Sequence, residues 1–534
     1  MKEHYLKKAL LIVMIAAGVF IRLQMAWFHF VHYDDVGIAV SYLRDNDGLN
    51  FLWKRGWTYA PLQIIFSTAF LSEQNSYITN LFISRIPSAV CGILSIIAIY
   101  ILIKRMYCRK ESESKTTYLP LLAAALITFS WQNIIYSAQA EPYTIGVLFV
   151  TIILLFSSYE SEFQHKSFFI CLSVIMGILC YGQYQIFIFV FTYYLACFWD
   201  CLIKKEYKAL LQYLIASIGS LLLTVPILLK IITLGLLSRG TNWNVGPENC
   251  YLFTWPNSNL GEGIEYIFTF FIKNIYLLYE NFFVSNKENW GGHLSAIILL
   301  LLSILGAIFL QKRKDRKLKV FVNLSFLLIL IMIVLGKLTL SPSRHMMVMF
   351  PFMILLICEG IVSLGKLWSN KTIGNKLTLA LILAIMLVFF LDYPTEFSKR
   401  KMILDEKTIK ERVEEYQPDI ICAHGYFFAI NMMNFPGYTN ITDSSLPEMS
   451  YYVKSQEQAN TRIMFVGGGP VSEESINKVI KDIREKEQTE LSPSSEWSII
   501  YNEEEMPKSA TEYSKSWGEW GNGKQILVYD VKSN

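Results

Sequence analysis

The sequence predicts an α-helical polytopic membrane protein with a small C-terminal α/β domain. Two observations carry the membrane part of this prediction. Of the 534 residues, 53% are hydrophobic and 17% are charged, with a mean hydropathy of +0.36. Apolar runs of about twenty residues, the length that crosses a bilayer as a helix, recur along the chain. The expected surroundings are therefore a lipid bilayer, and nothing in the composition indicates nucleic-acid binding.

The apolar runs predict about eleven transmembrane helices, since each run is long enough to cross the hydrocarbon core. We place them at residues 9–31, 82–103, 118–136, 142–157, 167–182, 184–201, 210–230, 293–310, 320–336, 346–363 and 377–392. The first run follows Lys2, Lys7 and Lys8, and no small-residue cleavage site comes after it. We therefore expect a retained first span and not a signal peptide.

Basic clusters predict the orientation of these helices. They follow the spans at residues 104–110, 204–208, 312–319 and 366–376, which all fall on one side if the spans alternate. Lysine and arginine are enriched in cytoplasmic loops. We therefore expect a plasma-membrane protein with a cytoplasmic N-terminus and an extracytoplasmic C-terminal part. A shorter apolar stretch, from Pro61 to about Leu71, is expected to lie in the interface or to re-enter the membrane.

The composition changes near Tyr393, which predicts two domains, residues 1–392 and 393–534. The second part carries 23 acidic and 16 basic residues. Its pattern predicts helices at residues 405–416 and 473–486 and strands at 420–423, 462–466, 497–501 and 525–531. This alternation is typical of a small α/β domain.

The loop after the first span carries the first candidate site residues. Asp34 and Asp35 follow the apolar run at the depth where a helix meets water, and ionised groups there are costly enough to indicate function. Arg55 and Tyr59 lie further along the same loop among tryptophans. They are expected to line a substrate site, although aromatic residues at this depth also form interfacial belts.

Two further external turns carry polar groups. Gln139, Glu141 and Tyr143 lie between two spans, and Gln183 lies in the next external turn. Glu141 either caps the helix that begins after Pro142 or provides a second catalytic carboxylate facing the cavity of Asp34. The other three are expected to line the substrate site, and a polar contact within a helix hairpin is the alternative.

A cationic group precedes the span at residues 346–363. It comprises Lys337, Arg344 and His345. An arginine at a membrane boundary can simply reach lipid phosphates. A guanidinium is also the side chain that best matches phosphate oxygens, and we favour recognition of a donor phosphate.

The order of these features resembles the GT-C membrane glycosyltransferases. The similarity runs from about Leu6 to Leu391 and is greatest to the bacterial branch related to protein O-mannosyltransferases and aminoarabinose-lipid A transferases. The segments that carry it are Asp34-Asp35, Tyr59–Leu62, Ser84–Ala89, Ser137–Tyr143 and Ser341–His345 before a span with Pro351. The resemblance implies transfer of a hexose or pentose from a polyprenyl-phosphate donor to an extracytoplasmic acceptor, with inversion.

The resemblance also implies residue roles. Asp34 matches the aspartate proposed as the base, and Arg344 matches an arginine near the carrier phosphate. Four positions depart from the family pattern. Asp35 stands where glutamate is usual, Gln139 where glutamate is frequent, and Glu141 where arginine is frequent. Gln183 stands where relatives often have histidine.

The chemistry needs a carboxylate within about 3 Å of the acceptor and positive charge on the departing phosphate. The acceptor would be a cell-envelope glycan, a lipid or a protein. We expect no cofactor and no metal, because two adjacent acids make a poor divalent-cation cage and the nine cysteines form no CxxC pair. Two other classes stay open: a transporter or flippase of lipid-linked sugars, and a membrane-anchored sensor with an external ligand-binding domain. Transporters tend to have internal repeats, and we see none.

Overall fold

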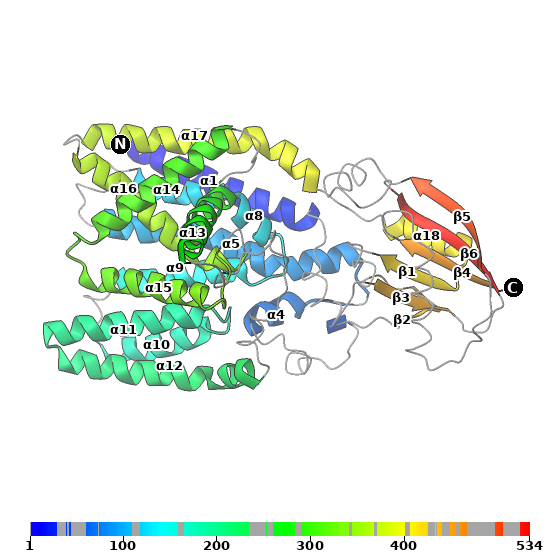
Figure 1. Ribbon diagram of the computed structural model, residues 1–534, viewed down its shortest axis with the longest axis horizontal. Helices are drawn as coiled ribbons and strands as arrows, with labels where there is room; N and C mark the ends of the chain where they lie inside the picture. The colour runs from blue at the N-terminus through cyan, green and yellow to red at the C-terminus, as the bar shows by residue number, and fades with distance from the viewer. Residues whose placement is uncertain are drawn as a thin grey trace.

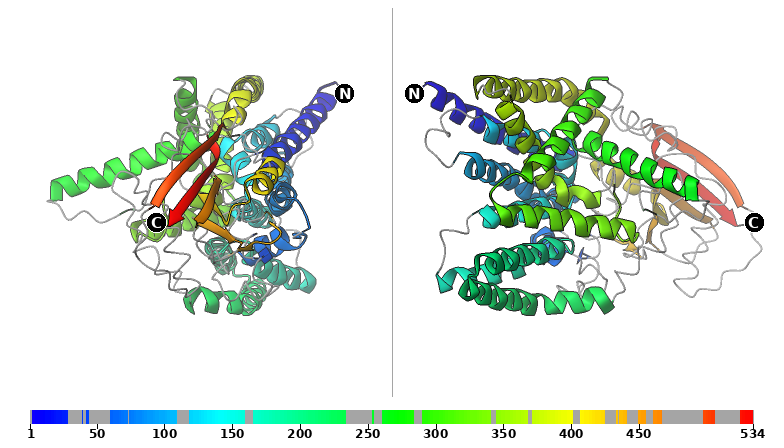
Figure 2. Two further views of the ribbon diagram at one scale, coloured as in Figure 1. Left: turned by 90° about the vertical axis from the view of Figure 1, so that its right-hand side faces the viewer. Right: turned by 60° about the vertical axis from the view of Figure 1, so that its left-hand side comes forward.

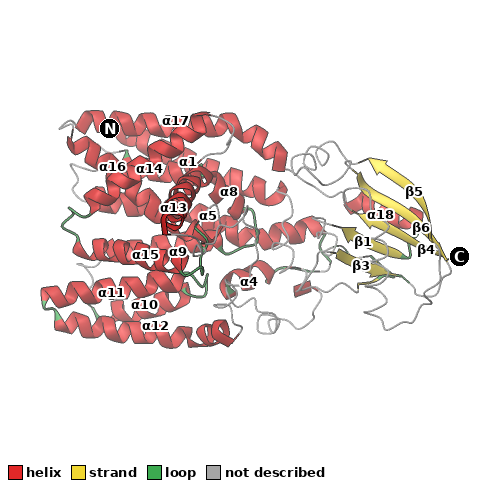
Figure 3. Cartoon of the chain, in the orientation of Figure 1, coloured by secondary structure: helices red, strands yellow, loops and turns green. Residues whose placement is uncertain are grey.

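In the computed structural model, the described part of the first 400 residues is mainly helical, and a six-stranded sheet follows it (Figures 1 and 3). The structure describes residues 2–28, 39, 42–43, 60–72, 74–108, 118–158, 165–233, 253, 260–283, 290–340, 344–367, 371–400, 406–424, 433, 435–440, 449–454, 460–466, 497–505 and 524–533.

Most of the helices are apolar and long. In chain order they are α1 (Lys2–Phe28), α4 (Pro61–Thr68), α5 (Tyr77–Tyr107), α7 (Leu119–Thr128), α8 (Trp131–Ser137), α9 (Tyr143–Ser158), α10 (Lys166–Leu179), α11 (Ile186–Lys204), α12 (Tyr207–Thr233), α13 (Leu260–Phe283), α14 (Trp290–Leu310), α15 (Arg316–Val334), the 3-10 helix η5 (Arg344–Met349), α16 (Phe350–Leu367) and α17 (Lys371–Arg400).

The predicted multi-pass membrane class is confirmed. Within the described residues, eight helices are long and apolar enough to span a membrane, and the pair α7 and α8, bent by 55°, forms either a ninth, broken span or a re-entrant loop. α9 and α10 are shorter apolar helices. Each of the eleven predicted spans therefore coincides with one helix or with this bent pair.

Helix α13 was not predicted. Glu265, Lys273 and Glu280 interrupt its apolar residues, so it lacks the continuous apolar run of a span. In Figure 1 most helices run along the horizontal axis, whereas α13 is seen almost end-on, and Figure 2 shows it extending sideways. It therefore crosses the direction of the bundle. The short stretch at Pro61 forms the eight-residue helix α4, which packs on α5.

The bend between α7 and α8 is filled by a buried arginine. Arg22 of α1 is 0% exposed and donates hydrogen bonds to the carbonyl oxygens of Ile127 (2.9 Å) and Thr128 (3.3 Å) and to Asn133 Oδ1 (2.7 Å). Those carbonyls lie in the last turn of α7, where backbone oxygens lack helical partners and a cation is favourable. Gly92 of α5 leaves room for this side chain, since a Cβ there would lie 2.9 Å from Arg22 Nε.

Glycines also let α14 and α16 approach closely. A Cβ on Gly306 would lie 1.9 Å from the carbonyl oxygen of Leu356, and a Cβ on Gly360 would lie 2.1 Å from that of Leu302. Small residues at a helix crossing permit backbone contact, which replaces hydrophobic driving force inside a bilayer.

The C-terminal part contains one helix and a mixed sheet. These elements are α18 (Glu406–Tyr416), β1 (Ile420–His424), β2 (Thr439–Asn440), β3 (Met449–Val453), β4 (Asn460–Val466), β5 (Trp497–Glu505) and β6 (Lys524–Ser533). The strand order is β2-β3-β1-β4-β6-β5, with β1 parallel to β4 and the other neighbours antiparallel. The four predicted strands and the first predicted helix coincide with β1, β4, β5, β6 and α18, whereas β2 and β3 were missed.

Two sequence-based boundaries need comment. The predicted helix at residues 473–486 lies outside the described residues. Helix α17 continues past residue 393 to Arg400, so the first element of the C-terminal part is α18. The division into residues 1–392 and 393–534 stays a prediction.

The bundle has two chemically different ends. At one, which we call the basic end, Arg313 forms an ion pair with Glu359 (2.8 Å) and donates to the carbonyl oxygen of Met106 (3.4 Å), and Tyr107 also donates to Glu359. The described part of the predicted basic cluster at residues 104–110 therefore meets the cluster at residues 312–319 there. At the other end, which we call the site end, α17 ends and the sheet follows (Figure 1). Which end faces the cytoplasm stays a prediction.

Candidate functional site

Three segments that are distant in sequence meet at the site end. The backbone N–H of Leu62, in α4, donates to the carbonyl oxygen of Tyr181 (3.1 Å). The Gln63 amide donates to the Ser88 hydroxyl (2.9 Å), which donates in turn to the carbonyl oxygen of Glu141 (2.9 Å). The short helix α4, the turn before α9 and the turn before α11 are thus tied together through α5.

Helix α9 completes this network. Thr144 donates to the carbonyl oxygen of Ser88 (2.9 Å). Gly146 faces both Gln183 and η5, because a Cβ there would lie 2.1 Å from Gln183 Oε1 and 2.9 Å from a methyl carbon of Val348. The absence of a side chain at Gly146 therefore brings the turn at Gln183 against the helix that begins with Arg344.

A buried ion pair lies at the centre of the site. Arg344 Nη1 and Glu141 Oε1 are 3.2 Å apart, and their side chains are 27% and 2% exposed. A carboxylate this buried needs a compensating charge, which the guanidinium provides. The guanidinium also lies over the Tyr143 ring, 5.7 Å from its centroid, in a cation–π contact.

Aromatic side chains surround this ion pair. The rings of His345 and Tyr143 have centroids 6.0 Å apart, and His345 Nδ1 lies 3.3 Å from the Thr339 hydroxyl. Burial raises the pKa of Tyr184, and a hydrogen bond with Gln185 and then the positive charge of Arg344 oppose this by smaller amounts. Tyr184 therefore stays a neutral phenol beside the cation at physiological pH.

Most of the described candidate residues come together. Glu141, Tyr143, Arg344 and His345 are in direct contact, Gln183 lies against the neighbouring Gly146, and Gln139 is 4% exposed in the turn that carries Glu141. Asp34, Asp35, Arg55 and Tyr59 lie outside the described residues.

Lys337 is the exception among the described candidates. Its backbone N–H donates to the carbonyl oxygen of Met332 (2.9 Å). No contact shown for the described residues brings its amine to Arg344 or His345. A role of Lys337 in phosphate binding stays a prediction.

Several residues of the site were not singled out from the sequence. Gln63, Ser88, Thr144 and Gln185 are buried at the site end. The signal that could have found the two glutamines is a long polar side chain within or beside an apolar helix, which is costly unless it is hydrogen-bonded.

Among the described residues no group of three or more His, Cys, Asp or Glu side chains could hold a metal ion. Asp34 and Asp35 are not among them, so a metal-free reaction stays a prediction.

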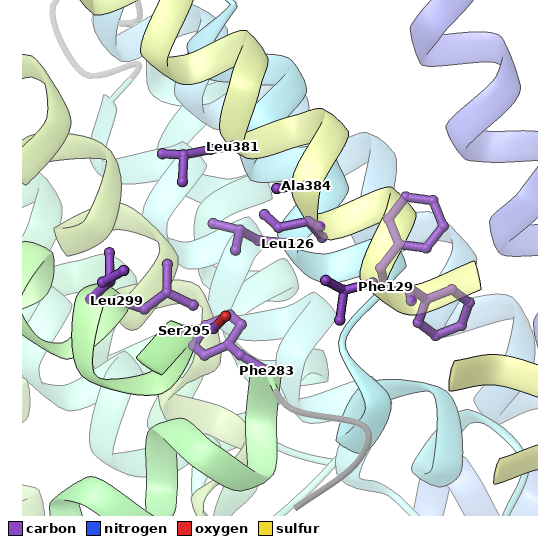
Figure 4. A pocket seen from close by; sticks show the side chains of 11 residues that line it. Leu126, Phe129, Phe283, Ser295, Leu299, Leu381 and Ala384 are labelled. Carbon is purple, nitrogen blue, oxygen red and sulfur yellow. The ribbon is translucent and has the colours of Figure 1, made fainter. Parts of the chain in front are cut away.

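A second feature is an apolar pocket of about 110 Å³ between α7, α13, α14 and α17 (Figure 4). Its lining residues are Leu126, Phe129, Phe283, Ser295, Ile298, Leu299, Leu381, Ala384, Ile385, Val388 and Phe389. Phe283 also packs on Phe350, with ring centroids 5.4 Å apart, and Phe350 follows η5 directly. Such a lining suits hydrocarbon and not a sugar.

The fold and the site together define a polytopic helical membrane protein with a buried ion pair at one end of its bundle. Among solved structures, the archaeal oligosaccharyltransferase AglB from Archaeoglobus fulgidus, in complex with an inhibitory peptide and a dolichol-phosphate, is similar to it, with 12% sequence identity and a TM-score of 0.42. The match covers 77% of this chain and 59% of that chain, so this chain spans less than two thirds of its length. No family model and no curated protein matches the chain.

Proposed function

We propose that the protein is a membrane glycosyltransferase that transfers a sugar from a polyprenyl-phosphate donor to an extracytoplasmic acceptor with inversion. The observation that carries this proposal is the Glu141–Arg344 pair. It combines a buried carboxylate with a partly exposed guanidinium, among tyrosines and a histidine at one end of a membrane bundle. A cation held in this way suits a lipid-linked phosphate.

Arg344 acts on the donor. Its planar guanidinium matches phosphate oxygens, and Glu141 and Tyr143 fix its orientation. Negative charge develops on the phosphate as its bond to the anomeric carbon breaks, and a prepositioned cation stabilises that charge. His345 lies beside the same tyrosine and supports the phosphate from the next position.

The acceptor is activated by a carboxylate in this proposal. Its hydroxyl or amine gives a proton to Asp34 and attacks the anomeric carbon, and polyprenyl phosphate leaves from the opposite face. This single displacement inverts the configuration. Glu141 serves the donor side because its carboxylate is engaged by Arg344, and Asp35 assists Asp34.

The base is tested with Asp34→Asn in the purified, lipid-reconstituted chain. We expect transfer to be abolished while farnesyl phosphate still binds, because the phosphate site does not need a proton acceptor. Asp45→Asn, in the same loop, is the matched control and should remain active. Transfer at the wild-type rate by Asp34→Asn would remove Asp34 as the base.

The phosphate site is tested with Arg344→Ala and Lys337→Ala. Loss of a charge-assisted phosphate contact is expected to weaken farnesyl phosphate binding by about 10- to 100-fold in Arg344→Ala. Lys337→Ala should change it less. Equal affinity of Arg344→Ala and wild type would rule out the assigned role of Arg344.

The other two classes make different predictions. A flippase needs a sealed vesicle, whereas an enzyme consumes a polyprenyl-phosphate sugar in detergent. A sensor needs its external domain, so a chain truncated after Arg400, where α17 ends, would keep full transfer only if the bundle is the enzyme. Consumption of donor in detergent would exclude the flippase as the explanation.

A further inference from the structure

Helix α13 carries a row of large apolar side chains on its exposed side. Ile264, Phe268, Ile272 and Ile275 follow one another at the three- and four-residue spacing that places side chains on one face of a helix. All four are exposed, Phe268 by 63% and Ile272 by 66%. We call this row the apolar face of α13. A continuous apolar row at a surface indicates an interaction site, whereas single exposed apolar residues do not.

The other sides of α13 differ from the apolar face. Glu265, Thr269 and Lys273 each come directly after one of the apolar residues, so they lie about 100° further around the helix, and all three are exposed. We call them the polar face. Phe270 and Leu278 lie on the third side and are buried. The helix therefore has an apolar face, a polar face and a side that packs on the protein.

The direction of α13 decides what these faces meet. The spans run roughly along the membrane normal, because their apolar length has to cross the hydrocarbon core. α13 extends across them and outward from the bundle (Figures 1 and 2), so it runs along the plane of the membrane. A helix in this orientation has apolar surroundings on one side and polar surroundings on another only at the boundary between hydrocarbon and water.

The start of α14 shows that α13 lies at this boundary. His293 Nδ1 is 2.8 Å from Glu280 Oε1 and 2.6 Å from the hydroxyl of Tyr276, which also donates to Glu280 (3.0 Å). Tyr276 and Glu280 continue the polar face of α13, at seven residues from Thr269 and Lys273. His293 lies in the first turn of α14, whose spanning part begins at residue 292. The polar face therefore meets α14 where that span enters the membrane.

The C-terminal end of α13 is fixed at the site end of the bundle. Ser130, between α7 and α8, donates to the carbonyl oxygen of Phe282 (2.6 Å). The Phe282 ring stacks on Phe350, with centroids 4.7 Å apart and planes 15° from parallel, and Phe350 directly follows η5. The leaflet in question is therefore the one at the site end.

We propose that α13 lies in the surface of the membrane leaflet at the site end, with its apolar face against lipid acyl chains and its polar face toward head groups and water. This inference does not depend on the proposed function. Its occupant is lipid because the apolar face continues the lipid-facing surface of the spans: Leu294, the residue after His293, is already exposed on α14. Lys273 can extend its amine toward the head groups from this position.

A second copy of the chain is the competing occupant, since protein can also cover an apolar face. The test replaces Phe268 by the photoreactive residue p-benzoylphenylalanine in the full chain, purified and reconstituted in phosphatidylcholine vesicles. Irradiation joins the benzophenone to a neighbouring C–H group, and mass spectrometry of the intact chain identifies the partner. We expect an adduct that is heavier by one phosphatidylcholine molecule.

Two other positions are matched controls for this experiment. The same residue in place of Leu301, which is exposed in the middle of the α14 span, reports the yield for a side chain in hydrocarbon. In place of Lys273 it reports the polar face, about 140° around the helix from Phe268. The yield of lipid adduct at Phe268 should be close to that at Leu301 and several-fold higher than that at Lys273. Ile272 provides a second probe of the apolar face, and its exposure lets it be replaced without disturbing the packing.

Three outcomes would overturn the inference. Covalent dimers as the main product at Phe268 and Ile272 would show that a second copy covers the apolar face. No lipid adduct at either position, with a normal yield at Leu301, would place α13 outside the bilayer. Equal lipid yields at Phe268 and Lys273 would show that lipid surrounds the helix, which contradicts a position at the water boundary.

Discussion

Removing Arg344 should destabilise the chain more than removing Arg344 and Glu141 together. Glu141 is 2% exposed, so Arg344→Gln removes the positive charge that faces a buried carboxylate. Breaking a fully buried pair costs about 3–5 kcal/mol. Because Arg344 is 27% exposed, solvent screens part of this interaction and we expect about 2 kcal/mol. The double variant Glu141→Gln/Arg344→Gln has no charge to compensate and should lose less than about 1 kcal/mol.

The measurement is a double-mutant cycle on the free energy of unfolding, from denaturant titration of the full chain in mixed micelles. Arg412→Gln is the control, because its pair with Glu415 is exposed on α18 and such pairs contribute about 0–1 kcal/mol. The reasoning is refuted if Arg344→Gln and the double variant have the same stability. The charges would then be uncoupled despite their short distance.

Three further outcomes are expected from the same titration. Gly306→Leu should lower the free energy of unfolding by about 1–3 kcal/mol, because the new leucine side chain would meet the backbone of Leu356 and force α14 away from α16. A variant as stable as wild type would contradict this close packing. Arg22→Leu should lower the free energy of unfolding by at least about 2 kcal/mol, because carbonyls at the end of α7 lose their donor. Arg22→Lys keeps a positive charge and should recover part of this loss. If Arg22→Lys is no more stable than Arg22→Leu, the result argues against a charge effect. Tyr107→Phe should cost about 1 kcal/mol through the lost hydrogen bond to buried Glu359, and no loss would mean that water or Arg313 replaces the phenol.

The spans were predictable because crossing a bilayer requires a fixed length of apolar helix. That requirement acts within one segment, so spans such as residues 210–230 and 293–310 can be predicted from their own apolar sequence without knowledge of the fold. Helix α13 does not meet it. Its apolar residues share the helix with Glu265 and Glu280, and a helix that lies across the bundle is decided by what it packs against.

The site was predictable as a set of residues and not as an arrangement. Glu141 and Arg344 were each selected for their charge at a membrane boundary, yet a capping role stayed open for Glu141 and a lipid contact for Arg344. Their pairing joins positions 203 residues apart and depends on the tertiary fold. Gln63 and Gln185 gave no motif, because a glutamine beside an apolar run becomes informative only when its neighbours are known.

The contact between Arg22 and α7 has a consequence for biosynthesis. One acceptor of this guanidinium, the carbonyl oxygen of Gly18, lies in its own helix, and the others lie 105 to 111 residues later in the chain. At about 5–20 residues per second these later acceptors emerge roughly 5–20 s after Arg22 has been made. During that interval the first span carries a charge that costs about 2.5–3.5 kcal/mol at the centre of an inserting helix. Insertion of α1 is therefore completed by a later part of the chain, and a ribosome-bound fragment that stops before Ile127 should integrate its first helix less efficiently than the same fragment with Arg22→Leu.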